Sequence, residues 1–234
     1  MANNFKNAVI RNVSADSTLP TVIYSVPDSK KSIAIELDVA NKGSAGVNVT
    51  VQIEDESKNE TKDQAGTVTA SNAHVISAVD TNASGATAGQ LTTTSNADHN
   101  LIVNDRVLFN FSSAPSFTNA SLPPSGDAAL SASRFYYVQS VTTSAPFKFT
   151  IAETKSAASA LTFDAAGGGL EFKKIHLADV VKDAPVPVGG TLKVISGQKL
   201  VLESAAASSN DKLYAYCTSA NDVDAIASVL EDVS

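Results

Sequence analysis

The sequence predicts an all-β protein. We expect an antiparallel, jelly-roll-like β-sandwich formed by residues 1–66 together with 172–234, and a smaller β-sandwich or barrel domain inserted at 67–171. Three observations predict this organisation. Apolar and polar residues alternate near both ends of the chain, which is the period of a half-buried strand. The middle differs in composition, being rich in Ala, Ser, Thr, Asn and Gly, and it lacks helical periodicity.

The N-terminal segment is expected to supply three strands. Val22, Tyr24 and Val26 alternate before Pro27, which ends the strand because proline cannot donate to a ladder. The run 30–53 then alternates on both sides of a glycine-containing turn, with apolar residues at positions 33, 35, 37 and 39 and again at 47, 49, 51 and 53. This pattern predicts a hairpin and, with the preceding strand, a three-stranded meander.

The middle segment follows a charged run at 54–63. We interpret that run as a solvated loop, because it lacks the glycine around which calcium loops space their ligands. Six short apolar-rich runs come next, at 74–79, 90–95, 105–111, 134–141, 147–153 and 160–163. Their spacing and the turns between them predict a separate all-β domain. The tract around Pro123 is expected to be a loop tip, and the glycines at 167–169 an exit linker.

The C-terminal segment supplies the remaining strands of the sandwich. Strands are predicted at 172–181, 185–195, 199–204 and 212–219, the middle two separated by a glycine turn. The last run, 224–233, fits both a helix and a strand, and we favour a strand because every neighbour is β. Added to the N-terminal three, these strands give a count typical of a two-sheet sandwich, which neither end could complete alone.

Composition argues against several function classes. The net charge is −7, and no stretch concentrates Lys or Arg among aromatic residues, so no nucleic-acid partner is expected. Lys30-Lys31 and Lys173-Lys174 are single pairs, interpreted as solvated strand ends. No run approaches the length of a membrane span and the N-terminus lacks a secretory leader, so we expect no membrane association and synthesis in the cytosol.

No catalytic, cofactor-binding or metal-ligating residue is assigned from the sequence. The single cysteine, Cys217, lies in an apparent strand and is interpreted as a core or edge residue. A catalytic thiol would need a positioned histidine, and His74, His99 and His176 are scattered with no motif near them. The sequence therefore predicts a non-enzymatic protein without a cofactor.

The outer segments carry six short motifs in a fixed order. These are Asn4-Phe5-Lys6, Tyr24-Ser25-Val26-Pro27, Leu37-Asp38-Val39-Ala40-Asn41, Lys182-Asp183-Ala184-Pro185-Val186-Pro187-Val188-Gly189, Leu200-Val201-Leu202-Glu203 and Ser228-Val229-Leu230-Glu231. On these motifs the outer part of the chain resembles a group of small virion structural proteins of tailed bacteriophages, especially phages of marine bacteria and cyanobacteria. The group usually has Gly-Asp after the Leu-Glu pair, whereas a Ser- and Ala-rich stretch follows Glu203 here, which alters the expected turn.

The middle segment is similar to a second phage-associated β-domain. The pieces that carry this resemblance are His99, Leu101, Asp105, Val107 and Phe109, followed by Tyr136-Tyr137-Val138 and Phe147-Lys148-Phe149. A glycine normally precedes the aspartate, and Asn104 stands there instead, a residue that also tolerates left-handed backbone conformations. Domains of this kind recur in tail and other virion proteins.

These resemblances imply a structural component of the virion, assembled as a symmetric oligomer at the tail or neck. Its expected partners are copies of itself and other virion proteins, through edge strands and sandwich faces. Capsid decoration on the head surface is the alternative placement. The N-terminal arm through Phe5 is equally consistent with a strap onto a neighbouring subunit and with a frayed terminus.

Two further functions need particular side chains. A receptor- or glycan-binding role of the inserted domain would need an exposed aromatic platform, for which Phe135, Tyr136 and Tyr137 are the available cluster, although alternation favours core packing. A glycan hydrolase would need paired carboxylates, and Asp222 and Asp224 are the one tight pair near an ordered element. We interpret that pair as the solvated start of a strand.

Overall fold

A computed structural model describes residues 4–56, 74–82, 84–85, 87–94, 99–118, 125–204 and 210–232. The all-β prediction is confirmed, since these residues form antiparallel sheets and no α-helix. None of them belongs to a helix that could cross a membrane. The chain divides into two compact units, which we call the sandwich unit (Met1–Lys58 with His176–Ser234) and the barrel unit (Asn59–Ile175).

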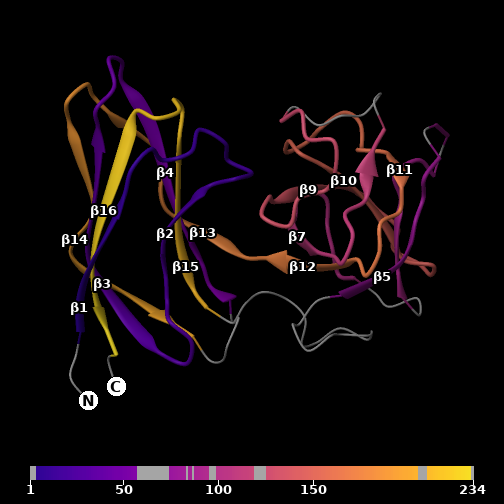
Figure 1. Cartoon of the computed structure of the whole chain (residues 1–234), viewed down its shortest axis with the longest axis horizontal. Helices are drawn as coiled ribbons and strands as arrows, with labels where there is room; N and C mark the ends of the chain where they lie inside the picture. Colours follow the sequence, from indigo (N-terminus) through magenta and orange to yellow (C-terminus); the bar gives the residue numbers. More distant parts are fainter. Residues whose placement is uncertain are drawn as a thin grey trace. The chain divides into compact units, whose positions relative to one another are not determined.

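The sandwich unit consists of two four-stranded antiparallel sheets (Figure 1). The first sheet has the order β1-β16-β3-β14, with bounds Asn4–Ile10, Val223–Glu231, Lys31–Asn41 and Thr191–Glu203. The second has the order β13-β4-β15-β2, with bounds Leu177–Val186, Val47–Glu54, Lys212–Cys217 and Thr21–Ser25. The strand predicted at the end of the chain is β16, and it lies at the centre of the first sheet.

The predicted hairpin over residues 30–53 is wrong, and so is the meander. Strand β3 pairs with β14 and β16, whereas β4 pairs with β13 and β15 in the opposite sheet. Both strands alternate because each turns one face towards the same core. Alternation therefore identified the strands but carried no information about which strand each one pairs with.

The core of the sandwich lies between the two sheets and is built mainly from aliphatic side chains. Leu37 and Val39 of β3 face Val49 and Val51 of β4 across it, all fully buried. The predicted inward face of β3 is only partly right, because Ala34 is buried while Ile33 and Ile35 are half-buried. A bulge causes this difference: Glu36 and Ala34 pair with consecutive residues of β16, which leaves one extra residue on β3.

Two other strand predictions need correction. The run 172–181 is two strands, because β12 (Glu171–Ile175) pairs within the barrel unit and β13 begins at Leu177 in the sandwich unit. The run 185–195 begins in β13, which ends at Val186, and continues after a turn into β14, where residues 191–195 are joined with the run predicted at 199–204 in one strand of thirteen residues. Gly197 has a φ of 73° there and creates a bulge instead of a turn, since the register shifts between Ser196 and Leu200.

The barrel unit is a closed barrel with the strand order β10-β6-β5-β12-β7-β9. The bounds of these strands are Lys148–Ala152, Leu91–Thr93, His74–Val79, Glu171–Ile175, Arg106–Asn110 and Tyr136–Val141. Its core is more aromatic than that of the sandwich, and the Phe149 and Phe172 rings lie 4.8 Å apart. A two-stranded sheet of β8 (Ser116–Phe117) and β11 (Phe163–Ala165) completes the unit.

The glycines at 167–169 are not an exit linker. Gly168 exchanges backbone hydrogen bonds with Ser113, at 2.9 and 3.2 Å, inside the barrel unit. Gly167 and Gly169 have positive φ angles, and a Cβ at Gly167 would come within 2.4 Å of the Ser113 carbonyl oxygen. These glycines are therefore required by close backbone packing. The loop tip predicted at Pro123 lies outside the described residues.

Candidate functional site

The lone cysteine is a core residue of the sandwich unit. Cys217 is buried near the end of β15, and its Sγ lies 3.0 Å from the Ser219 carbonyl oxygen. Burial raises the pKa of the thiol, which keeps it in the protonated, poorly nucleophilic form. This placement agrees with the interpretation of Cys217 as a packing residue.

The three histidines occupy separate structural positions. His74 is buried and stacks on Phe172, with ring centroids 5.2 Å apart. His99 accepts a hydrogen bond from the Leu101 backbone N–H at 3.1 Å. His176 lies between β12 and β13, and no group of three potential metal ligands occurs among the described residues. His74 thus takes part in ring packing and His99 in local hydrogen bonding.

The carboxylate pair at the start of β16 is held by local contacts. Asp224 accepts hydrogen bonds from Lys42 Nζ at 2.7 Å and from the Asn12 backbone N–H at 3.0 Å. The Lys42 contact holds the pKa of Asp224 below its usual range, which is opposite to what a general acid needs. Asp222 accepts a hydrogen bond from the Ser219 hydroxyl. Both aspartates anchor the loops that lead into β16.

The aromatic cluster of the barrel unit is not an exposed platform. Phe135, Tyr136 and Tyr137 are 3%, 0% and 7% exposed. The Tyr136 hydroxyl accepts a hydrogen bond from the Ser131 backbone N–H at 2.9 Å, and burial raises the pKa of Tyr136 to about 12. These side chains fill the core, as alternation favoured, and a glycan could stack on them only after unfolding.

The charged run at 54–63 begins inside the protein and not in solvent. Glu54 is 1% exposed at the end of β4 and accepts hydrogen bonds from Tyr214 Oη at 2.7 Å and Lys212 Nζ at 3.3 Å. Glu56 is also buried, and its backbone N–H donates to Asp211. The solvated-loop interpretation is therefore wrong for these two glutamates, while residues 57–63 lie outside the described part of the chain. The sequence alone could not predict that Glu54 is buried, because Tyr214 and Lys212 come beside it only through the pairing of β15 with β4.

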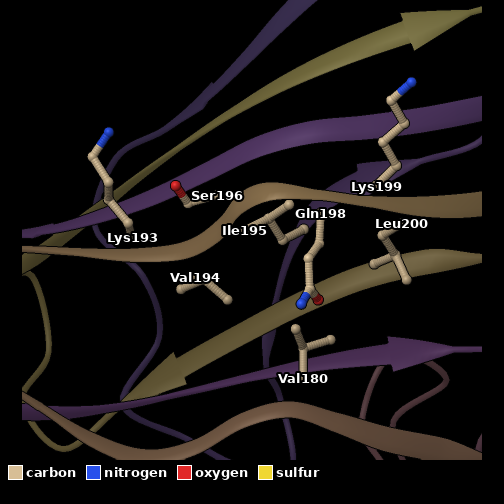
Figure 2. Close-up of a pocket in the computed structure, with 8 residues that line it drawn as sticks. All are labelled: Val180, Lys193, Val194, Ile195, Ser196, Gln198, Lys199 and Leu200. Atoms are coloured by element: carbon tan, nitrogen blue, oxygen red, sulfur yellow. The ribbon is translucent and has the colours of Figure 1, made fainter.

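A cavity of about 330 Å³ opens between β13 and β14, which are the edge strands on one side of the sandwich (Figure 2). Val180 of β13 and Val194 and Leu200 of β14 line it together with the Gln198 amide. Figure 2 shows the ammonium groups of Lys193 and Lys199 on the far side of the β14 ribbon from Val180. The lining also includes Ser196 and both lysines, so the cavity is partly polar and partly apolar, and none of the residues that line it is acidic.

The edges of the two sheets differ in how they limit further pairing. Strands β13 and β14 each contain two register shifts, and bulges of this kind oppose the addition of another strand. Strand β1 has no bulge, because all seven of its residues pair with β16 in continuous register. The frayed-terminus alternative for the N-terminal arm is wrong for Asn4 and Phe5, residues 1–3 lie outside the described part of the chain, and the strap alternative stays a prediction. Phe5 on this edge is 64% exposed.

No protein-family model matches the chain, and no curated protein matches it.

Proposed function

We propose that the protein is a non-enzymatic structural component of a tailed-phage virion, assembled as a symmetric oligomer at the tail or neck. The observation that carries the proposal is the strand order of the sandwich, β1-β16-β3-β14 facing β13-β4-β15-β2. Except for β4 and β13, consecutive strands of this unit alternate between the sheets. We infer that this is the eight-stranded jelly-roll order, an architecture found in viral capsid and lectin domains.

The environment of the chemically reactive side chains supports a structural role. Cys217 is buried with a raised pKa, Asp224 has a lowered pKa, and Glu54 is engaged by Tyr214 and Lys212. Each of these arrangements stabilises the fold, and none has the geometry of a nucleophile beside a base. The motifs that resemble phage virion proteins lie mainly in the sandwich unit, where they form β1, β2, β3, β13, β14 and β16.

Capsid decoration would use the same fold, so the copy number in the particle distinguishes the two placements. Receptor or glycan binding by the barrel unit would need a surface other than Phe135, Tyr136 and Tyr137, because these three are buried. The structural role is therefore preferred over the binding role.

The test uses purified particles of the phage that encodes the chain. Quantitative mass spectrometry should find the chain in washed particles at the copy number of a tail or neck ring, and antibody-gold labelling should decorate the tail or neck. Hundreds of copies with label over the head would reject the tail or neck placement in favour of decoration. Absence of the chain from washed particles would refute the virion role.

A further inference from the structure

The outward face of the first sheet carries a row of apolar side chains, one from each strand. Phe5 of β1 pairs with Leu230 of β16, Leu230 with Ile33 of β3, and Ile33 with Val201 of β14. Directly paired residues of antiparallel strands project from the same face, so the row runs across the whole sheet. Phe5 and Val201 are 64% and 53% exposed, and the two between them are half-buried.

Three further apolar residues lie on the same face. Val9 of β1 pairs with Ile226 of β16, and both are about half exposed. The bulge in β3 adds Ile35, because it shifts the alternation and turns Ile35 away from the core. We call the outward set Phe5, Leu230, Ile33, Val201, Val9, Ile226 and Ile35 the apolar face.

The size of the apolar face suits a protein interface. Its four most exposed members present roughly 400 Å² of side-chain surface, which is within the size of the largest apolar patch on a typical monomer, and such patches are often functional. A standard interface takes about 800 Å² from each partner, a little over half of it apolar. The apolar face can therefore supply the apolar part of one such interface, with the surrounding polar residues as its rim.

The charges around the apolar face balance in sign: two ion pairs lie there, and Asp38 and Lys199 (Figure 2) add one charge of each sign on the same side of the sheet. Lys193 Nζ lies 3.2 Å from a Glu36 carboxylate oxygen, and Lys31 Nζ lies 2.9 Å from a carboxylate oxygen of Glu203. These cross-strand pairs join β3 to β14 on the outward side of the sheet. Two copies of a chain with a net charge of −7 repel each other in general, but this face can meet its own image with little net repulsion.

We propose that the apolar face binds a second copy of the chain, with the two faces packed about a twofold axis. Two stacked sheets keep their strand directions within about 30° of each other, so a row across one sheet can lie along the same row of its mate. In a twofold contact the same surface of each copy meets the other copy. A face whose positive and negative charges balance can meet itself in this way. The proposal rests on the oligomeric structural role proposed above and names one contact within that oligomer, the one that joins two copies into a dimer.

The balance of charge and side-chain type favours a second copy over other occupants. A nucleic acid or an anionic membrane would be recognised by an excess of Lys and Arg. Here Lys31 and Lys193 pair with Glu203 and Glu36, and Lys199 is offset by Asp38 on the same face, so the described residues of this face carry no such excess. A glycan would be recognised by a cluster of aromatic rings, and Phe5 is the one ring of the apolar face.

The test measures the mass of the full chain by sedimentation velocity and light scattering. Wild-type protein should have an even multiple of the 24.1 kDa chain mass, and Val201→Lys and Ile226→Lys should each halve the observed mass. The matched control is Ile102→Lys in the barrel unit, which removes an apolar residue that is more exposed (65%) than Val201 or Ile226 and should leave the mass unchanged. Val201→Leu should also keep the wild-type mass, because it preserves the apolar contact.

Two results would overturn the proposal. One is a wild-type protein of 24.1 kDa up to about 100 µM, a concentration that saturates a contact with a micromolar dissociation constant. The other is an oligomer whose mass survives both lysine substitutions in variants with wild-type circular dichroism, which would reject this face but leave the structural role standing. Failure of the structural role is read separately, from the absence of the chain in washed particles.

Discussion

Substitution of Tyr214 by phenylalanine tests whether a buried acid stabilises the sandwich unit. Tyr214 lies on the outward side of β15, and its hydroxyl donates to Glu54 Oε2 at 2.7 Å. Burial, with the neighbouring Glu54 carboxylate, raises the pKa of Tyr214 above its usual range, so the hydroxyl remains a donor at every pH used for folding studies. The phenylalanine variant loses this donor while keeping the ring and its packing.

The expected cost follows from the burial of both partners. Glu54 is 1% exposed, and a hydrogen bond to a buried charged group contributes about 1.5–3 kcal/mol. We expect Tyr214→Phe to lower the free energy of unfolding of the sandwich unit by about 2 kcal/mol, which corresponds to a fall in Tm of roughly 8 °C for a unit of about 100 residues. Lys212 still donates to Glu54 in the variant, so the acid is not left entirely unpaired.

Differential scanning calorimetry of the full chain measures the shift, with the barrel unit as an internal reference. Tyr216→Phe is the matched control, because Tyr216 lies on the same face of β15 but is half-buried and pairs with Thr50 instead of lying beside Glu54. It should change the Tm by less than about 2 °C, as expected for a substitution away from buried polar contacts. Equal, small effects of the two substitutions would refute the argument that the Glu54 carboxylate is held by Tyr214.

Three other substitutions test the cores and the barrel. Leu37→Ala should destabilise the sandwich unit by about 2–5 kcal/mol in chemical denaturation, because it empties a fully buried site, and a cost under about 1 kcal/mol would contradict the core position. Arg134→Met should lower the stability of the barrel unit by about 3–5 kcal/mol, because the buried Glu153 carboxylate loses its ion-pair partner at 3.1 Å; a calorimetric scan in which only the sandwich transition moves would contradict this. Tyr136→Phe should cost about 1 kcal/mol at neutral pH through the lost hydrogen bond to Ser131, and it should also reduce the alkaline loss of stability. The pKa of Tyr136, raised by burial to about 12, exceeds the value of about 10 in the unfolded chain, so unfolding releases a proton and stability falls as pH rises from 10 to 12. If the free energy of unfolding falls equally steeply between pH 10 and 12 in wild type and variant, Tyr136 is not the source of the alkaline loss of stability.

The positions of strands could be predicted from the sequence far better than their pairing. Alternation located β2, β3, β4 and β15, because each places apolar side chains on one face of a core. Pairing is decided by contacts between residues far apart in the chain, such as Val39 with Ala225, and no local pattern encodes them. The hairpin predicted for β3 and β4 failed for this reason.

A bulge explains why the sequence did not reveal which apolar side chains of β3 lie on the outer face of the sheet. Ile33 and Ile35 are in phase with Leu37 and Val39 in the sequence, so alternation assigns all four to the core. One extra residue in β3 reverses that phase, and Ala34 is buried in their place. The apolar face was therefore hidden among residues that looked like core. Buried acids were missed in a similar way, because Glu54 belongs to a charged run whose remaining residues lie beyond the described strands.

The barrel unit is inserted between two sandwich strands whose ends already lie side by side. Strands β4 and β13 are the one pair of consecutive sandwich strands in the same sheet, and Glu54 at the end of β4 is directly paired with Leu177 at the start of β13. In the barrel, His74 of its first strand is paired with Phe172 of its last. Each unit therefore holds its own two ends of the insertion about one strand spacing apart, so the chain can leave and rejoin the sandwich sheet without separating paired strands. Because the register of β1-β16-β3-β14 is set by pairing within the sandwich unit, substitutions on the outer face of this sheet should leave the strand pairing of the barrel unit unchanged.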